Sequence, residues 1–158
     1  MTRRYRRHEY RYRSGQPGIT RYSVDRIHHV HKIGKIRYVR AVSYRSRKDG
    51  IVRLAVIVRG EKGYCRFEGF CFGYGGEGPH GLRRLFEAIR VPESIAVHIC
   101  HETKSPDYSK NQEHWRLDCG TNNEWYRLRV YNSDGITTEN QLYEIVAKPQ
   151  PVQLQLAY

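Results

Sequence analysis

The segment IRYVRAVSYRSRKDGIVRLAVIVRG, residues 36–60, carries the clearest secondary-structure signal of the chain. Two runs rich in Val, Ile and Tyr, residues 36–48 and 51–59, flank the dipeptide Asp49-Gly50. Asp-Gly is favoured in two-residue hairpin turns because the turn needs positive φ at its central positions. The segment therefore predicts an antiparallel β-hairpin.

The two-residue turn sets the register, with Lys48 opposite Ile51, and thereby sorts the side chains onto two faces. One face is mostly aliphatic and is expected to pack into the core, and it comprises Val39, Ala41, Arg45, Arg47, Val52, Leu54, Val56 and Val58. The other face mixes rings with guanidinium groups, and it comprises Tyr38, Arg40, Val42, Tyr44, Arg53, Ala55, Ile57 and Arg59. Such a face suits base stacking and phosphate binding, and it is equally typical of a solvated sheet without a ligand.

The rest of the chain alternates between strand and helix signals. Further strands are predicted at residues 64–74, 94–101, 114–119, 124–131 and 152–156. One helix is predicted from about His80 to Val91, and a second begins at the capping box of Thr138 and Gln141 and ends before Pro149. The pattern predicts an α+β fold, with an antiparallel sheet of about six strands and two helices.

The chain of 158 residues has the composition of a globular domain, with no apolar run long enough to cross a membrane and no apolar signal-peptide core. We expect a cytoplasmic protein with no membrane partner. Its formal net charge is +12. The whole excess lies in residues 1–50, because residues 51–158 carry equal numbers of basic and acidic side chains. A concentrated basic segment favours polyanionic partners.

Residues 1–22 alternate Arg and Tyr with almost no aliphatic residues, which predicts a mobile basic arm ahead of a single α+β domain over residues 23–158. The arm residues expected to contact nucleic acid are Arg3, Arg4, Arg6, Arg7, Arg11 and Arg13. A solubilising tail without a specific ligand is the alternative interpretation.

A glycine-rich loop lies between the predicted strand 64–74 and the first helix. Glycines before a helix N-terminus allow backbone N–H groups to approach a phosphate. The candidate phosphate or nucleotide site comprises Gly75, Gly76, Glu77, Gly78, His80, Gly81, Arg83 and Arg84. The loop lacks the Gly-Lys-Ser/Thr of a P-loop and the spacing of the dinucleotide fingerprint. A tight strand-to-helix connection explains the same glycines without a ligand.

The loop also resembles a G-Y-G-G-x-G-P signature, followed by an apolar helix, that occurs in small phage and bacterial proteins of uncharacterised function. The resemblance covers about residues 67–90, with Gly73 to Gly76 and Gly78-Pro79 at the matching positions and Glu77 where a small residue is expected. The resemblance implies a phage-type origin and brings no activity. It adds one alternative, a phage protein acting in the host cytoplasm that sequesters a small nucleotide signal of host defence.

Cysteine and histidine spacing predicts neither a disulfide framework nor a metal site. Cys65 and Cys71 are too far apart along one predicted strand to pair, whereas a bridge between Cys100 and Cys119 is geometrically allowed. The histidines and cysteines between residues 98 and 119 show no CxxC or HxxxH spacing, so no metal and no cofactor are expected.

These observations favour a non-enzymatic protein that recognises phosphate groups, with nucleic acid as the principal expected partner. A small phosphorylated nucleotide bound at the glycine-rich loop is the alternative. A nuclease that uses His80 or His114 with neighbouring arginines is the third hypothesis. The sequence leaves a homo-oligomer open.

Overall fold

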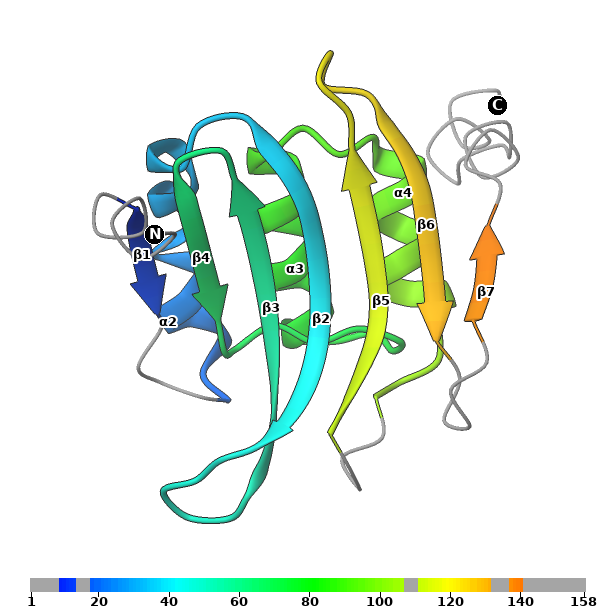
Figure 1. The fold of residues 1–158 in the computed structure, drawn as a ribbon. Coiled ribbons are helices and arrows are strands. Elements are labelled where there is room, and N and C mark those ends of the chain that lie inside the picture. Colours follow the sequence, from blue (N-terminus) through cyan, green and yellow to red (C-terminus); the bar gives the residue numbers. More distant parts are fainter. Residues whose placement is uncertain (1–8, 14–17, 107–110, 132–136, 141–158) are drawn as a thin grey trace.

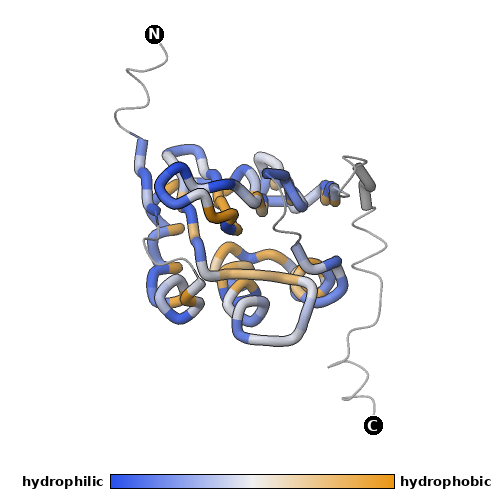
Figure 2. Tube along the Cα trace, turned by 90° about the horizontal axis from the view of Figure 1, so that it is seen from below, coloured by the Kyte–Doolittle hydropathy of each residue, from blue (hydrophilic) through white to orange (hydrophobic). Residues whose placement is uncertain are grey.

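The structure is a computed structural model that describes residues 9–13, 18–106, 111–131 and 137–140. Within these residues a sheet forms one layer, and the helices form a second layer on one of its faces (Figures 1 and 2). The strands are β1 (Tyr10–Arg13), β2 (Ile36–Arg45), β3 (Val52–Gly60), β4 (Gly63–Phe67), β5 (Gln112–Cys119), β6 (Trp125–Tyr131) and β7 (Thr137–Asn140). The helices are α2 (Thr20–Val24), the 3-10 helix η1 (Ile27–Lys32), α3 (Glu77–Ala88), α4 (Glu93–Val97) and the π-helix η2 (His98–Glu102).

The described strands form one seven-stranded sheet in the order β1-β4-β3-β2-β5-β6-β7. β1 runs parallel to β4, and the other neighbouring strands are antiparallel. The predicted α+β class is therefore confirmed, with a sheet that is mostly rather than wholly antiparallel. None of the helices in the described ranges is long and apolar enough to cross a membrane.

The β2–β3 hairpin is present, but its turn is longer than the sequence predicts. Arg45 lies opposite Val52, so six residues connect the strands. Ser46 N donates to the carbonyl of Ile51, and Gly50 N donates to the carbonyl of Ser46, which closes the wider loop. The predicted register, with Lys48 opposite Ile51, is therefore wrong, and it differs from the observed register by two residues. Because side chains alternate with a period of two, this shift leaves the residues of both strands on their predicted faces, whereas Arg47 lies in the loop.

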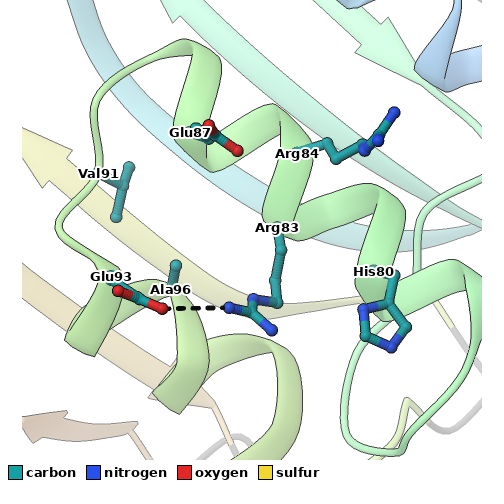
Figure 3. Close-up of a pocket in the computed structure, with 7 residues that line it drawn as sticks. All are labelled: His80, Arg83, Arg84, Glu87, Val91, Glu93 and Ala96. Atoms are coloured by element: carbon teal, nitrogen blue, oxygen red, sulfur yellow. Dashed lines mark hydrogen bonds and ion pairs between the residues drawn. The ribbon is translucent and has the colours of Figure 1, made fainter. Parts of the chain in front are cut away.

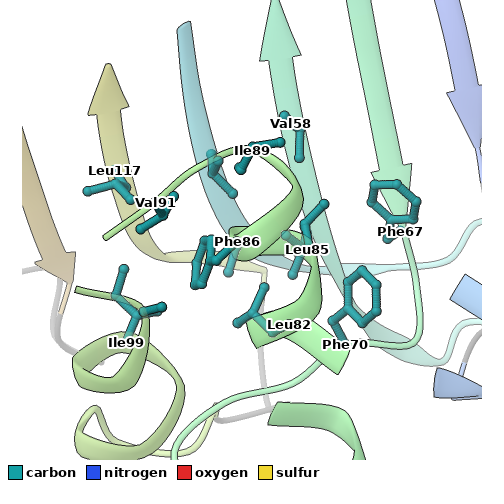
Figure 4. Close-up of a cluster of buried hydrophobic side chains, with 14 of the residues drawn as sticks. Val58, Phe67, Phe70, Leu82, Leu85, Phe86, Ile89, Val91, Ile99 and Leu117 are labelled. Carbon is teal, nitrogen blue, oxygen red and sulfur yellow. The ribbon is translucent and has the colours of Figure 1, made fainter. Parts of the chain in front are cut away.

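The aliphatic face of the hairpin forms the centre of the core. The core side chains of β2 and β3 (Val39, Ala41, Leu54, Val56 and Val58) are buried, and they face α3. From α3, Leu82, Leu85 and Phe86 pack into the same cluster, together with Phe67 of β4 and Leu117 of β5 (Figure 4). The described helices thus cover the aliphatic face of the sheet, and none of them lies on its Arg/Tyr face.

The first predicted helix is confirmed as α3, about three residues earlier than expected. It ends at Ala88 because Arg90 adopts a left-handed conformation with φ of 63°. The N–H of Arg90 donates to the carbonyl of Glu87, and the N–H of Val91 donates to the carbonyl of Phe86. This pattern is the Schellman motif that ends many helices, and glycine is its usual left-handed residue.

The predicted strand at residues 94–101 is wrong, because this segment is helical in α4 and η2. Pro92 precedes the first turn, where its fixed φ is compatible with a helix start. Four residues of this segment are buried at helical spacing, namely Ile95, Ala96, Ile99 and Cys100. In a strand, whose side chains alternate between two faces, these four residues would not lie on one side. The cluster of His98, Cys100 and His101 is therefore not arranged on a strand.

The predicted strand at residues 64–74 is shorter in the structure, because β4 ends at Phe67. The following residues form the connection to α3 and pass close to the N-terminus of α2. A side chain at Gly69 would clash with the backbone of Ile19. Gly73, with φ of 86°, contacts the backbone of Lys104 and Ser105. Glycine is required at both places, because a side chain at either position would overlap neighbouring backbone atoms.

The structure describes only the start of the second predicted helix, and there the prediction is wrong. Residues 137–140 form β7, and Thr138 lies opposite Val130 of β6. β-branched threonines favour extended structure, and the exposed edge of β6 offers unpaired backbone groups. The remainder of that predicted helix and the predicted strand at residues 152–156 lie outside the described residues.

The expectation of a mobile arm over residues 1–22 is corrected for residues 10–13, which form β1. Tyr12 stacks on His29 with ring centroids 3.9 Å apart and also contacts Phe67, so its ring supplies apolar contacts that the sequence pattern did not reveal. Gly63 lets β1 approach β4, because any side chain there would overlap the backbone of Tyr10. Residues 20–22 belong to α2, while residues 1–8 and 14–17 lie outside the described residues.

Candidate nucleic-acid interface

The face of the sheet opposite the helices (Figure 1), which we call the open face, is rich in arginine. Residues of this face alternate with core residues along each strand, so the same period that builds the core also exposes the guanidinium groups. Its arginines come from six strands, and they are Arg11, Arg13, Arg40, Arg53, Arg59, Arg66, Arg116, Arg127 and Arg129.

The strand register aligns these side chains in two rows that cross the sheet. One row, the arginine row, contains Arg13, Arg66, Ile57, Arg40, Arg116 and Arg129 in spatial order. The other row, the mixed row, contains Arg11, Tyr64, Arg59, Tyr38, Asp118 and Arg127. Corresponding members of the rows lie two residues apart on the same strand and therefore share the open face.

Asp118 holds three arginines of the open face in place. Its carboxylate is 3% exposed and accepts bonds from Arg116 Nε at 2.9 Å, Arg127 Nε at 3.1 Å and Arg129 Nη2 at 3.3 Å. Burial alone would raise the pKa of Asp118, but the hydrogen bonds from Arg116 and Arg127 outweigh it, so the pKa lies below its ordinary value. The buried carboxylate therefore stays charged and fixes the guanidinium groups above it.

Two tyrosines of the open face lie beneath arginines. The guanidinium of Arg116 lies 4.0 Å from the ring centre of Tyr38, and that of Arg66 lies 4.2 Å from the ring centre of Tyr44. Tyr44 Oη also donates to Glu68 Oε1 at 2.7 Å. The pKa of Tyr44 is raised, mainly by burial and to a smaller extent by this hydrogen bond. The phenol therefore stays protonated. The rings thus support the guanidinium planes from below.

Carboxylates balance only part of the positive charge on this face. Glu9 forms ion pairs with Arg59 and with Arg11, and the bond from Arg59 lowers the pKa of Glu9. Arg40 pairs with Glu113 at 3.4 Å. The nine arginines meet five carboxylates, namely Glu9, Asp49, Glu68, Glu113 and Asp118. A positive surplus therefore remains on a surface that no described helix covers.

A depression of about 520 Å³ interrupts this surface on the side of β1. It lies over Ile57, where the arginine row has a short aliphatic side chain, and residues of both rows surround it. Its remaining lining residues are Glu9, Arg11, Arg13, Tyr38, Arg40, Arg59, Tyr64 and Arg66.

The structure brings together every predicted nucleic-acid residue that it describes. Arg11, Arg13, Tyr38, Arg40, Tyr44, Arg53 and Arg59 all lie on the open face, while Arg3, Arg4, Arg6 and Arg7 lie outside the described residues. Five further residues of this face were not among the predicted ones, namely Tyr64, Arg66, Arg116, Arg127 and Arg129. Arginines alternate with core residues in β4, β5 and β6 as they do in β2, but this alternation does not show which strands pair in the sheet.

The glycine-rich loop has two kinds of glycine. Gly78 and Gly81 are buried in α3, where added side chains would clash with Cys71 and with Thr20. Gly75, by contrast, faces open space, and Gly76 immediately precedes the helix. Packing against neighbouring side chains therefore explains the first pair without a ligand, and the tight connection anticipated for this loop is present.

His80, Arg83 and Arg84 line a groove of about 470 Å³ along the outer side of α3 (Figure 3). Arg83 Nη2 reaches across to Glu93 Oε1 at 3.4 Å, whereas Arg84 points away from that pair. Glu87 also lines the groove, so its charges are mixed. The groove lies in the helix layer, so the structure does not join these loop residues to the open face.

The two histidines of the nuclease hypothesis lie in different environments. His114 is 6% exposed in β5, where Nε2 lies 3.0 Å from Ser43 Oγ and Nδ1 lies 3.1 Å from Gln112 Nε2. His80 is exposed on α3, and its ring lies near that of His101. The structure therefore does not combine His80 and His114 in one site.

The four cysteines are free thiols, so the allowed bridge between Cys100 and Cys119 is not formed. Burial raises the pKa of Cys65 and of Cys100 to about 12. Among the described residues, no three His, Cys, Asp or Glu side chains gather closely enough to hold a metal ion. Comparisons of this chain with family models, curated proteins and solved structures gave no match.

Proposed function

We propose that this chain binds nucleic acid through the open face of its sheet. The observation that carries the proposal is the convergence of nine arginines from six strands on the one face that the described helices leave uncovered. Arginine suits this role because its fork of N–H donors matches phosphate oxygens and its plane stacks on bases.

The arrangement of the arginines supports the proposal further. Asp118 and the rings of Tyr38 and Tyr44 hold several guanidinium groups in fixed positions before any ligand arrives. Binding then costs less side-chain entropy than it would with freely rotating arginines. The positive surplus also speeds encounter with a polyanion, and the effect weakens as salt rises.

The test measures affinity for a fluorescent oligonucleotide at several salt concentrations. A double variant, Arg40→Gln with Arg129→Gln, removes two contacts from the open face, and Arg84→Gln removes one charge from the helix layer. For a single strand, we expect the double variant to reduce the slope of log affinity against log salt by about 1.4. Arg84→Gln should reduce the affinity slightly and leave the slope nearly unchanged. The absence of binding at about 50 mM salt, or equal effects per charge at both places, would contradict the proposal.

A small phosphorylated nucleotide in the α3 groove is the second candidate function. The groove gathers His80, Arg83 and Arg84, and its volume of about 470 Å³ lies within the range of small-ligand pockets. Its mixed charge places it second. A nucleotide bound there would raise the melting temperature as its concentration exceeds Kd, and Arg84→Gln would abolish that shift. The open-face double variant would serve as the control.

A further inference from the structure

The arginine row forms a line of charge perpendicular to the strands. It crosses β1, β4, β3, β2, β5 and β6 with five guanidinium-bearing residues and one gap at Ile57. Neighbouring strands lie about 4.8 Å apart, so the row spans about 24 Å. A stacked nucleic-acid strand advances about 3.4 Å per nucleotide, so about seven nucleotides match this length.

The mixed row runs beside the arginine row at a distance of about 7 Å, which is two residues along each strand. It places the rings of Tyr64 and Tyr38 on either side of Arg59. The depression over Ile57 lies between residues of both rows, and its volume of about 520 Å³ leaves room for a base beside the charged row. The guanidinium of Arg116 covers the ring of Tyr38, so the flat groups offered for stacking are the ring of Tyr64 and the Arg116 plane above Tyr38. One row therefore offers charge, and the other contributes rings that stack directly or through arginine.

We propose that the open face takes single-stranded nucleic acid, laid across the strands with its phosphates along the arginine row and its bases over the mixed row. This inference rests on the proposed function. A charged track beside stacking side chains is the usual arrangement of single-strand binding surfaces. A duplex hides its base faces and presents two backbones that flank a groove, and it is usually read by an element that enters that groove. No described helix lies on the open face to do so.

The contacts within the open face hold both ends of the row. At the β6 end, Asp118 bonds to Arg116 and Arg129. At the β1 end, Arg13 donates to Tyr64 Oη from Nε at 3.3 Å and from Nη2 at 3.2 Å. The two ends of the arginine row are therefore fixed at a separation that a short oligonucleotide does not span. Because only a longer oligonucleotide contacts both ends, affinity depends on ligand length.

The first experiment measures the affinity of the full chain for oligothymidylates of about 4, 8 and 16 nucleotides at one salt concentration. We expect affinity to rise about tenfold or more from the shortest to the middle length, because stacking and phosphate contacts are added. Beyond about eight nucleotides the increase should be small, apart from the statistical gain of overlapping sites. A mixed-sequence duplex of about 16 base pairs should compete about tenfold less well than either of its strands.

A pair of matched variants tests whether the row itself sets this length. Arg13→Gln with Arg129→Gln shortens the row at both ends, and Arg47→Gln with Arg84→Gln removes the same charge from the hairpin loop and the helix layer, outside the open face. The first pair should abolish most of the affinity gain from about 4 to about 8 nucleotides, and the second pair should preserve it. Circular dichroism and melting curves confirm that both variants fold.

The outcomes separate the inference from the function on which it rests. If no oligonucleotide binds to the wild-type chain, both are overturned. If the chain binds but affinity does not depend on length, or the duplex competes as well as its strands, the single-strand inference is overturned and the proposed function stands. Equal behaviour of the two double variants overturns the assignment to the arginine row in the same way.

Discussion

The open face of the sheet and the helix layer around α3 both carry residues that the sequence pointed to as phosphate binders, but the two regions use them differently. On the open face, arginines from six strands converge and hold one another in place through Asp118, Glu9 and two tyrosines. Beside α3, Gly78 and Gly81 are required by close packing, and Arg83 is paired with Glu93. The difference shows that glycines beside a helix can be required by packing, so their number alone does not indicate a phosphate site.

The largest expected effect is on the open face, at Asp118. Asp118→Asn leaves three guanidinium groups without their buried counter-charge, and we expect a loss of about 2–3 kcal/mol of unfolding free energy. This is below the range for fully buried pairs because the arginines reach solvent. Urea unfolding measures the loss. Glu113→Gln removes the same charge from the same strand beside Arg40, and it should cost well under 1 kcal/mol. Equal losses in the two variants would mean that Asp118 does not organise the face.

A smaller but clear effect is expected in the glycine-rich region. Gly81→Ala places a methyl group 2.5 Å from Thr20 Cγ2 and 2.9 Å from Phe70 Cδ1. This overpacking should cost about 1–3 kcal/mol in unfolding free energy. Gly75→Ala meets nothing within 4 Å, and it should change stability by less than about 0.5 kcal/mol. Neither change should alter oligonucleotide affinity, and a specific loss of binding in Gly75→Ala would shift the site to the loop.

The pH dependence of stability should also differ between the regions. The pKa of Asp118 is lower in the folded chain than its ordinary value of about 3.9. Its contribution is therefore complete above that ordinary value and is lost as pH falls through the lowered folded pKa. Urea unfolding between about pH 5 and pH 2 should show a steeper loss for the wild type than for Asp118→Asn. Parallel curves would contradict the assigned role of this carboxylate.

The smallest effect is expected at the end of α3. Arg90 occupies a left-handed position that glycine normally fills, so Arg90→Gly should stabilise the chain by about 0.5–1 kcal/mol. Thermal melting detects such a gain as a rise of a few degrees. The backbone carbonyl of Arg90, which accepts a bond from Trp125 Nε1 at 3.1 Å, remains in the variant. A fall in melting temperature would show that the Arg90 side chain contributes contacts that outweigh the backbone strain.

Sequence patterns predicted the parts of the fold that depend on strict periodicity. The hairpin faces, α3, β5 and β6 follow alternating or helical spacing, and each is present. The parallel strand β1 was not predicted, because its stability comes from contacts of Tyr12 with His29 and Phe67. The strand predicted at residues 94–101 is instead helical, and the buried residues Ile95 and Ile99 have helical spacing.

About half of the arginines of the open face could be predicted from the sequence. The hairpin placed Arg40, Arg53 and Arg59 on one face, because local register fixes which side chains alternate together. Arg116 and Arg129 joined that face only through the pairing of β5 with β2 and β6, which local periodicity does not determine. Long-range strand order was therefore the missing information.

The most direct measurement of the central claim is photochemical cross-linking of the wild-type chain to a thiouridine-containing oligonucleotide, with the linked residues identified by mass spectrometry. If nucleic acid binds to the open face, cross-links should fall on open-face residues, with Tyr64 foremost. Cross-links concentrated at Tyr74 and His80, beside the start of α3, would contradict the account and place the ligand in the helix layer.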